Sequence, residues 1–95
     1  MAEVRQSTLA GENTSRFLTF LMVQERQASL FLGRLPHPQT GRTEVNLPVA
    51  KVCIEQLEMI RDKTQGNLTG EEERILDGMI GDLQSAYTAA SEAAV

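Results

Sequence analysis

The sequence predicts an all-α fold, in which a long apolar first helix lies beside an antiparallel hairpin of two further helices. Three stretches place apolar side chains at helical spacing. Aromatic residues make up only 4% of the chain, with no Trp, which favours an aliphatic helical core over a β-sandwich. No stretch alternates long enough to predict a sheet, and Thr43-Glu44-Val45 is at most a short extended piece. A single domain of 95 residues buries only about 60–65% of its unfolded surface, so completion by oligomerisation is expected.

The first helix is predicted over about residues 15–33. Thr14 or Ser15 can cap its start, and Gly33 offers a stop. Residues 1–13 carry few apolar side chains to offset the entropy of ordering, so they are predicted to form a flexible tail. The three-helix domain is expected to span residues 14–90, followed by a C-terminal tail at 91–95.

Apolar side chains cover more of this first helix than one contact face requires. Beyond the set that recurs at helical spacing, further apolar residues are Leu18, Met22, Val23, Leu30 and Leu32. A second subunit is the simplest cover for the surplus. The interface that we predict on this helix consists of Phe17, Leu18, Phe20, Leu21, Met22 and Phe31.

The second helix is predicted over residues 47–64. Asn46 can accept hydrogen bonds from the first free amides, and Pro48 is tolerated in the first turn because no donor is lost there. Gly66 can take the left-handed conformation that ends the helix. Its apolar positions are Ala50, Cys53, Ile54, Leu57 and Ile60.

The third helix is predicted over residues 70–90. Thr69 and Glu72 have the spacing of a capping box, and the acidic run from Glu71 to Glu73 suits the positive end of the helix dipole. The preceding turn is short, which predicts an antiparallel hairpin with the second helix. Gly78 and Gly81 are expected to permit close helix packing. The apolar positions are Leu76, Met79, Ile80, Leu83, Tyr87 and Ala90.

The stretch at residues 35–48 holds all three prolines and the only histidine of the chain, and most of it forms the connection at about residues 34–46. His37 is the one side chain suited to proton transfer near neutral pH, but no second catalytic group accompanies it. The segment is therefore interpreted as a connector, in which Thr40 and Gly41 form a turn. Its candidate contact residues are Arg34, His37 and Arg42.

Charge and composition restrict the partners and the compartment. The net charge is −4, and residues 67–95 carry six acidic side chains against one basic. This balance argues against nucleic-acid binding as the main role. The single cysteine excludes an internal disulfide, no run is apolar enough to span a membrane, and the first residues lack a signal-peptide layout. A cytoplasmic location is expected.

The sequence predicts no enzyme activity, no catalytic residue, no metal site and no cofactor. Cys53 lies on an apolar helix face, and three adjacent glutamates on a helix point in different directions. The function expected is a non-enzymatic interaction module that self-associates, with a dimer favoured. The alternative is an accessory protein that docks on a larger assembly such as the translation machinery, with its acidic third helix toward a basic partner.

Several short motifs are similar to one known family. The chain resembles a small bacterial family catalogued as domain of unknown function 1844 over about residues 17–88, and the turn at 63–69 is the most specific part. The resemblance implies an all-helical, cytoplasmic, bacterial protein and no particular activity. The motifs are Pro36-His37-Pro38-Gln39-Thr40-Gly41, Asn46-Leu47 with Ala50-Lys51, Lys63-Thr64-Gln65-Gly66-Asn67-Leu68-Thr69, and Glu71 to Glu73.

Overall fold

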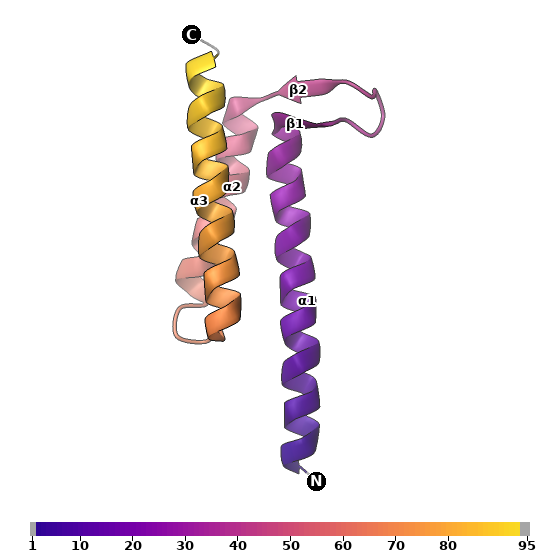
Figure 1. Cartoon of the computed structure of the whole chain (residues 1–95), viewed down its shortest axis with the longest axis vertical. Coiled ribbons are helices and arrows are strands. Elements are labelled where there is room, and N and C mark those ends of the chain that lie inside the picture. The colour runs from indigo at the N-terminus through magenta and orange to yellow at the C-terminus, as the bar shows by residue number, and fades with distance from the viewer. Residues whose placement is uncertain (1, 94–95) are drawn as a thin grey trace.

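Three helices and a small antiparallel hairpin make up the protein (Figure 1). The computed structural model describes the backbone of residues 2–93 and the side chains of residues 11–93. The elements in chain order are α1 (Ala2–Phe31), β1 (Leu32–Pro36), β2 (Thr43–Val45), α2 (Leu47–Lys63) and α3 (Gly70–Ala93). The mostly helical fold and the three predicted helices are confirmed.

Helices α2 and α3 run antiparallel beside the C-terminal half of α1, and the N-terminal half of α1 continues past the turn that joins them (Figure 1). Two side-chain contacts connect α2 to α3. The Gln84 amide donates to Glu58 at 2.8 Å, and Arg61 lies 3.8 Å from Asp77. The projecting helix gives a radius of gyration of 15.9 Å, against about 12 Å for a compact chain of this length.

The start of α1 differs from the sequence prediction. The helix begins at Ala2 and not at about residue 15, so most of the predicted tail at 1–13 has helical backbone. Extending a helix adds one hydrogen bond for each residue fixed, and Gly11 is the only strong helix breaker in this segment. The flexibility of residues 1–13 stays a prediction. At the other end α3 continues to Ala93, and residues 94–95 lie outside the described chain.

The prediction of a purely helical fold is wrong for the connection between α1 and α2. Strands β1 and β2 pair antiparallel, with Leu32 opposite Val45 and Pro36 opposite Thr43. The Asn46 amide donates to the Phe31 carbonyl at 2.7 Å and thereby closes the base of the hairpin. In Figure 1 the hairpin projects sideways from the end of α1, away from α2 and α3. The strands are short and strand propensity depends strongly on context, so the residue pattern of this segment did not predict the pairing.

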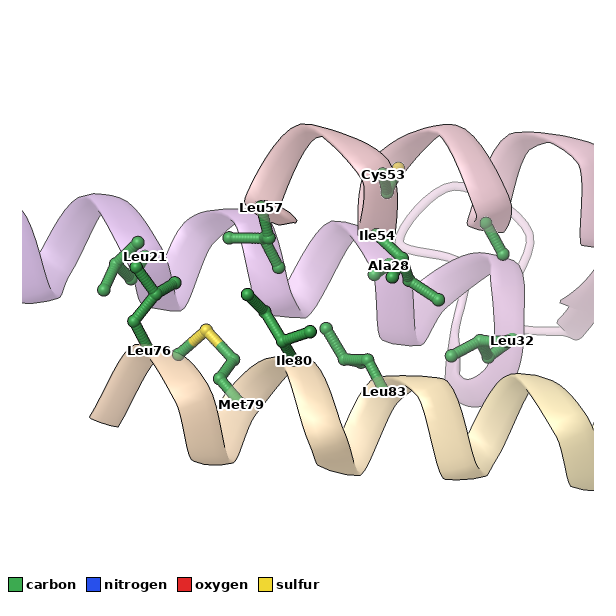
Figure 2. Packing of buried hydrophobic residues seen from close by; sticks show 11 residues of the cluster. Leu21, Ala28, Leu32, Cys53, Ile54, Leu57, Leu76, Met79, Ile80 and Leu83 are labelled. Atoms are coloured by element: carbon green, nitrogen blue, oxygen red, sulfur yellow. The ribbon is translucent and has the colours of Figure 1, made fainter. Parts of the chain in front are cut away.

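Aliphatic side chains from all three helices fill the core (Figure 2). Leu21 and Ala28 of α1 are fully buried, and Leu32 continues this line into β1. The largest fully buried side chains are Leu21, Leu57, Leu76, Ile80 and Leu83. Each helix contributes one narrow apolar face, which leaves its opposite side to the solvent.

The helix ends follow the local sequence. The Asn46 side chain accepts from the Val49 amide at 3.2 Å, as predicted for the start of α2. Gly66 has φ +85, the left-handed conformation expected after that helix. The predicted close packing at Gly78 and Gly81 is wrong, because a side chain at either position would meet nothing within 4 Å.

Candidate self-association surface

The structure divides the six predicted interface residues between the core and the surface. Leu21 is fully buried inside the chain and cannot contribute to an outer face. Phe17, Leu18 and Phe31 are partly buried and pack against the core. Phe20 and Met22 are exposed, with 45% and 64% of their surface accessible. The sequence pattern identified the helix, but it did not separate its inner face from its outer face.

Helix α1 carries an exposed row that alternates steps of three and four residues, which we call the α1 ridge: Phe20, Val23, Gln27 and Leu30. Val23 is 57% exposed and Leu30 is partly exposed. This spacing keeps side chains on one side of a helix and is the repeat by which helices pair. Val23 and Leu30 were noted as surplus apolar residues, but they were left out of the predicted interface.

A second exposed row follows β2 and α2, which we call the α2 ridge: Val45, Val49, Val52, Gln56 and Met59. Its three most exposed apolar members are Val45, Val52 and Met59, at 58%, 52% and 49%. Within α2 the same alternation of three and four residues runs from Val49 to Met59, whereas Val45 lies in β2. Sequence reasoning missed this row, although the spacing was the available signal.

Both ridges lie on the side of the molecule that faces away from α3. Thr14 of α1 lies near enough to Glu72 of α3 to help lower the pKa of its carboxyl group, and the α1 ridge lies roughly 120–180° around the helix from Thr14. On α2, Glu58 and Arg61 reach α3, whereas Val52 and Met59 lie roughly 100–180° away from them. Both ridges therefore point away from α3, and we call the surface of α1 and α2 that carries them the face formed by α1 and α2.

A groove of about 440 Å³ lies where the hairpin leaves α1. We call it the corner groove, and it is lined by Val23, Arg26, Gln27, Leu30, Leu35, Pro36 and Pro38. Three α1 ridge residues contribute to it, so the ridge and the groove are continuous. The hairpin forms the second wall because Gly33 has φ +79, which redirects the chain after the helix.

The candidate contact residues of the connection do not form one site. Arg34 donates to the Asp82 carboxylate of α3 at 2.9 Å, beside a groove of about 540 Å³. His37 stays in its own loop, where its Nδ1 accepts from the Gln39 amide at 3.2 Å. Its backbone amide donates to the Arg42 carbonyl at 2.8 Å, and the Arg42 side chain is exposed. Arg34 thus fastens the hairpin to α3, while the other two lie at its tip.

A family comparison covers the elements that form this surface. The model for a domain of unknown function (DUF1844) matches residues 14–89. The chain belongs to this family. The match in this DUF1844 chain runs from Thr14 through the hairpin and α2 to most of α3, and so contains both ridges and the core. Neither curated proteins nor solved structures yield a match.

The two titratable side chains with shifted pKa values in this DUF1844 domain, Glu72 and Cys53, lie in structural positions. The hydrogen bond from the Thr69 amide lowers the pKa of Glu72, burial opposes it, and contacts with the Thr14 and Thr69 side chains add to the lowering. Burial raises the pKa of the Cys53 thiol. Among the residues that the structure describes, no three His, Cys, Asp or Glu side chains are grouped closely enough to hold a metal ion. No helix in that part of the chain has the length and apolar character to cross a membrane.

Proposed function

We propose that this DUF1844 chain is a non-enzymatic interaction module that dimerises through the face formed by α1 and α2. The observation that carries the proposal is the gathering of large exposed apolar side chains on the two ridges. Six of the seven such residues belong to this face: Phe20, Val23, Val45, Val49, Val52 and Met59. Apolar surface gathered in this way marks protein–protein contact sites, because water contact with it is unfavourable.

A second copy of the chain suits this face because of how charge is distributed. The acidic excess of the chain lies in residues 67–95, which include α3 on the side away from the ridges. Two copies that meet through the ridges keep their acidic helices apart, which limits the repulsion between two chains of charge −4. Gln27 and Gln56 lie within the ridges, and an amide can both donate to and accept from polar groups of a partner.

The non-enzymatic part of the proposal is supported by the surroundings of the candidate groups. The hydrogen bonds of His37 connect it to Gln39, Gly41 and Arg42 of its own loop. Cys53 is buried, and burial disfavours the thiolate that a nucleophile requires. An unpaired thiol also fits the reducing cytoplasm, which we propose as the location.

Sedimentation equilibrium at micromolar concentration tests the proposal. We expect a mass of about twice the 10.5 kDa of the chain. The dimer should persist when salt is raised from 50 to 500 mM, because apolar burial is not screened by ions. A 10.5 kDa monomer at both salt concentrations would contradict the proposal. Salt-sensitive binding to a larger basic assembly would instead favour the accessory role, with α3 as the docking element.

A further inference from the structure

We propose that the dimer is formed by two antiparallel α1 helices, and that the corner groove of each copy receives the N-terminal half of the partner's α1. This inference rests on the proposed self-association and names its contact. The α2 ridge is then a flank of the interface and not its centre. Three features of the structure carry the proposal: ridge spacing, helix length and the position of the groove.

The spacing of the α1 ridge indicates that a helix of the partner packs against it. Phe20, Val23 and Leu30 are separated by three and seven residues, so they form a straight row along the helix. Such a row inserts between side chains of a second helix in the knobs-into-holes manner. An extended strand has a side-chain period of two and does not match this repeat.

The length of α1 carries its N-terminal part beyond the other two helices of the chain. The 30 residues of α1 extend about 45 Å, whereas the 17 residues of α2 extend about 26 Å. In Figure 1 the N-terminal half passes beyond the turn between α2 and α3. The contact of Thr14 with Glu72 marks where α3 begins beside α1. A projecting segment of this length is marginal as an isolated helix in water, so packing against a partner would stabilise it.

The position of the corner groove selects the antiparallel direction. When two α1 helices pair in opposite directions through their ridges, the projecting half of each continues past Leu30 of the other. It then reaches the hairpin residues Leu35, Pro36 and Pro38, which line the groove. A parallel pair would place the two projecting halves side by side and leave both grooves open. The antiparallel pair therefore covers the ridge, the groove and the projecting half together.

We propose the antiparallel register in which Gln27 of the α1 ridge faces a polar side chain of the partner. With Phe20 opposite the partner's Val23, Arg16 falls opposite the partner's Gln27, because the residue numbers of facing positions have a constant sum in antiparallel helices. The Gln27 amide oxygen can accept from the guanidinium. Arg16 is exposed in the single chain, where it lies 3.5 Å from Glu12. The register thus adds a partner to Arg16, which in the single chain also donates to the Asn13 side chain at 3.1 Å.

Val23→Glu and Val52→Glu form a matched pair of variants. Both valines lie on exposed helix surfaces, with 57% and 52% of their area accessible, so neither change opens the core. We expect Val23→Glu to weaken dimerisation roughly tenfold or more, because a charge would enter the centre of the contact. Val52→Glu should change the dimer dissociation constant less than about threefold. Circular dichroism melts check that both variants remain folded.

A charge-swap mixture tests the direction of pairing. Val23→Glu mixed with Phe20→Lys should restore a heterodimer, because positions 20 and 23 face each other in the proposed register. The inference is overturned if Val52→Glu dissociates the dimer while Val23→Glu does not, although the proposed self-association would survive that result. It is also overturned if the mixture stays monomeric. A monomeric wild type would remove both proposals.

Discussion

Thr69 and Glu72 cap the start of α3 reciprocally. The Thr69 amide donates to the Glu72 carboxylate at 2.8 Å, and the Glu72 amide donates to the Thr69 hydroxyl at 3.1 Å. Each side chain therefore satisfies a backbone donor that has no partner within the helix. The Thr14 side chain of α1 also helps to lower the pKa of this carboxylate, so the cap lies beside α1. One glutamate thus contributes both to a helix start and to the packing of two helices.

This cap predicts that the protein becomes less stable in acid. Because the pKa of Glu72 is lower in the folded chain than in the unfolded chain, its stabilising effect is present above the unfolded value of about 4.3. The effect is lost as the pH falls through the lower folded value. Urea unfolding between pH 7 and pH 2 should show a shallower pH dependence for Glu72→Gln. Thr69→Ala should lower the free energy of unfolding by about 1 kcal/mol. It should keep part of the pH dependence, because the backbone amide of residue 69 still donates to Glu72. An unchanged slope in Glu72→Gln would refute the assignment.

The close approach of Gly33 and Val45 predicts that a methyl group is not tolerated in β1. An added Cβ at Gly33 would lie 2.8 Å from a Val45 methyl, in a residue with φ +79. Gly41 is the matched control, because its φ is +71 and an added Cβ would meet nothing within 4 Å. Gly41→Ala should cost about 1–2 kcal/mol from backbone strain alone, and Gly33→Ala should cost more. Val45→Ala should recover part of that difference in a double-mutant cycle measured by urea unfolding. Equal costs for the two alanines would show that the contact is unimportant.

Local signals in the sequence predicted the helix caps but not the β-hairpin. Asn46 and the pair Thr69 and Glu72 act on backbone groups within a few residues, so their patterns could be interpreted directly. The strands contain Gly33 and Pro36, which are uncommon in strand interiors, and their pairing depends on how the chain leaves α1. Gly33 was predicted to stop the first helix, and α1 does end at Phe31. Gly33 itself, however, lies inside β1 with φ +79.

The candidate surface was predictable only in part for a related reason. The sequence indicated a surplus of apolar side chains on the first helix, but deciding which side faces inward requires the positions of α2 and α3. Leu21 and Met22 are adjacent in sequence, yet one is fully buried and the other is 64% exposed. The helical spacing of apolar residues alone placed both in the predicted interface. The α2 ridge was overlooked because its residues lie outside the apolar face of that helix, and their spacing alone does not show that they are exposed.

The assignment of Leu21 to the core predicts a large loss of stability in Leu21→Ala. Its side chain is fully buried among leucines and isoleucines of the other helices, so truncation leaves a cavity that costs about 2–5 kcal/mol. Met22→Ala is the neighbouring control, and it should change stability by less than about 0.5 kcal/mol because Met22 is exposed. Chemical denaturation followed by circular dichroism measures both. Similar losses at the two positions would contradict the observed orientation of α1.

The open surroundings of Gly78 and Gly81 predict that alanine stabilises α3. Both glycines are exposed within the helix, and an added methyl would meet no atom within 4 Å. Alanine is favoured over glycine in a helix interior by about 1 kcal/mol, largely through the entropy of the unfolded chain. Each variant should therefore raise the melting temperature by several degrees, and the double variant should raise it further. A decrease in either variant would indicate a contact at that position that the single chain does not make.

The burial of Cys53 predicts slow reaction with alkylating reagents. Burial raises the pKa of the thiol, so at pH 8 a smaller fraction is thiolate than in an unfolded chain, and access is also restricted. Iodoacetamide labelling followed by mass spectrometry should be slow in buffer and fast in urea. Val52→Cys in a Cys53→Ala background supplies the control, because position 52 is exposed one residue away.

Val23→Cys in the same background extends the test to the proposed dimer. Position 23 should become protected as protein concentration rises, while position 52 keeps its reactivity, since only the former lies at the centre of the α1 pair.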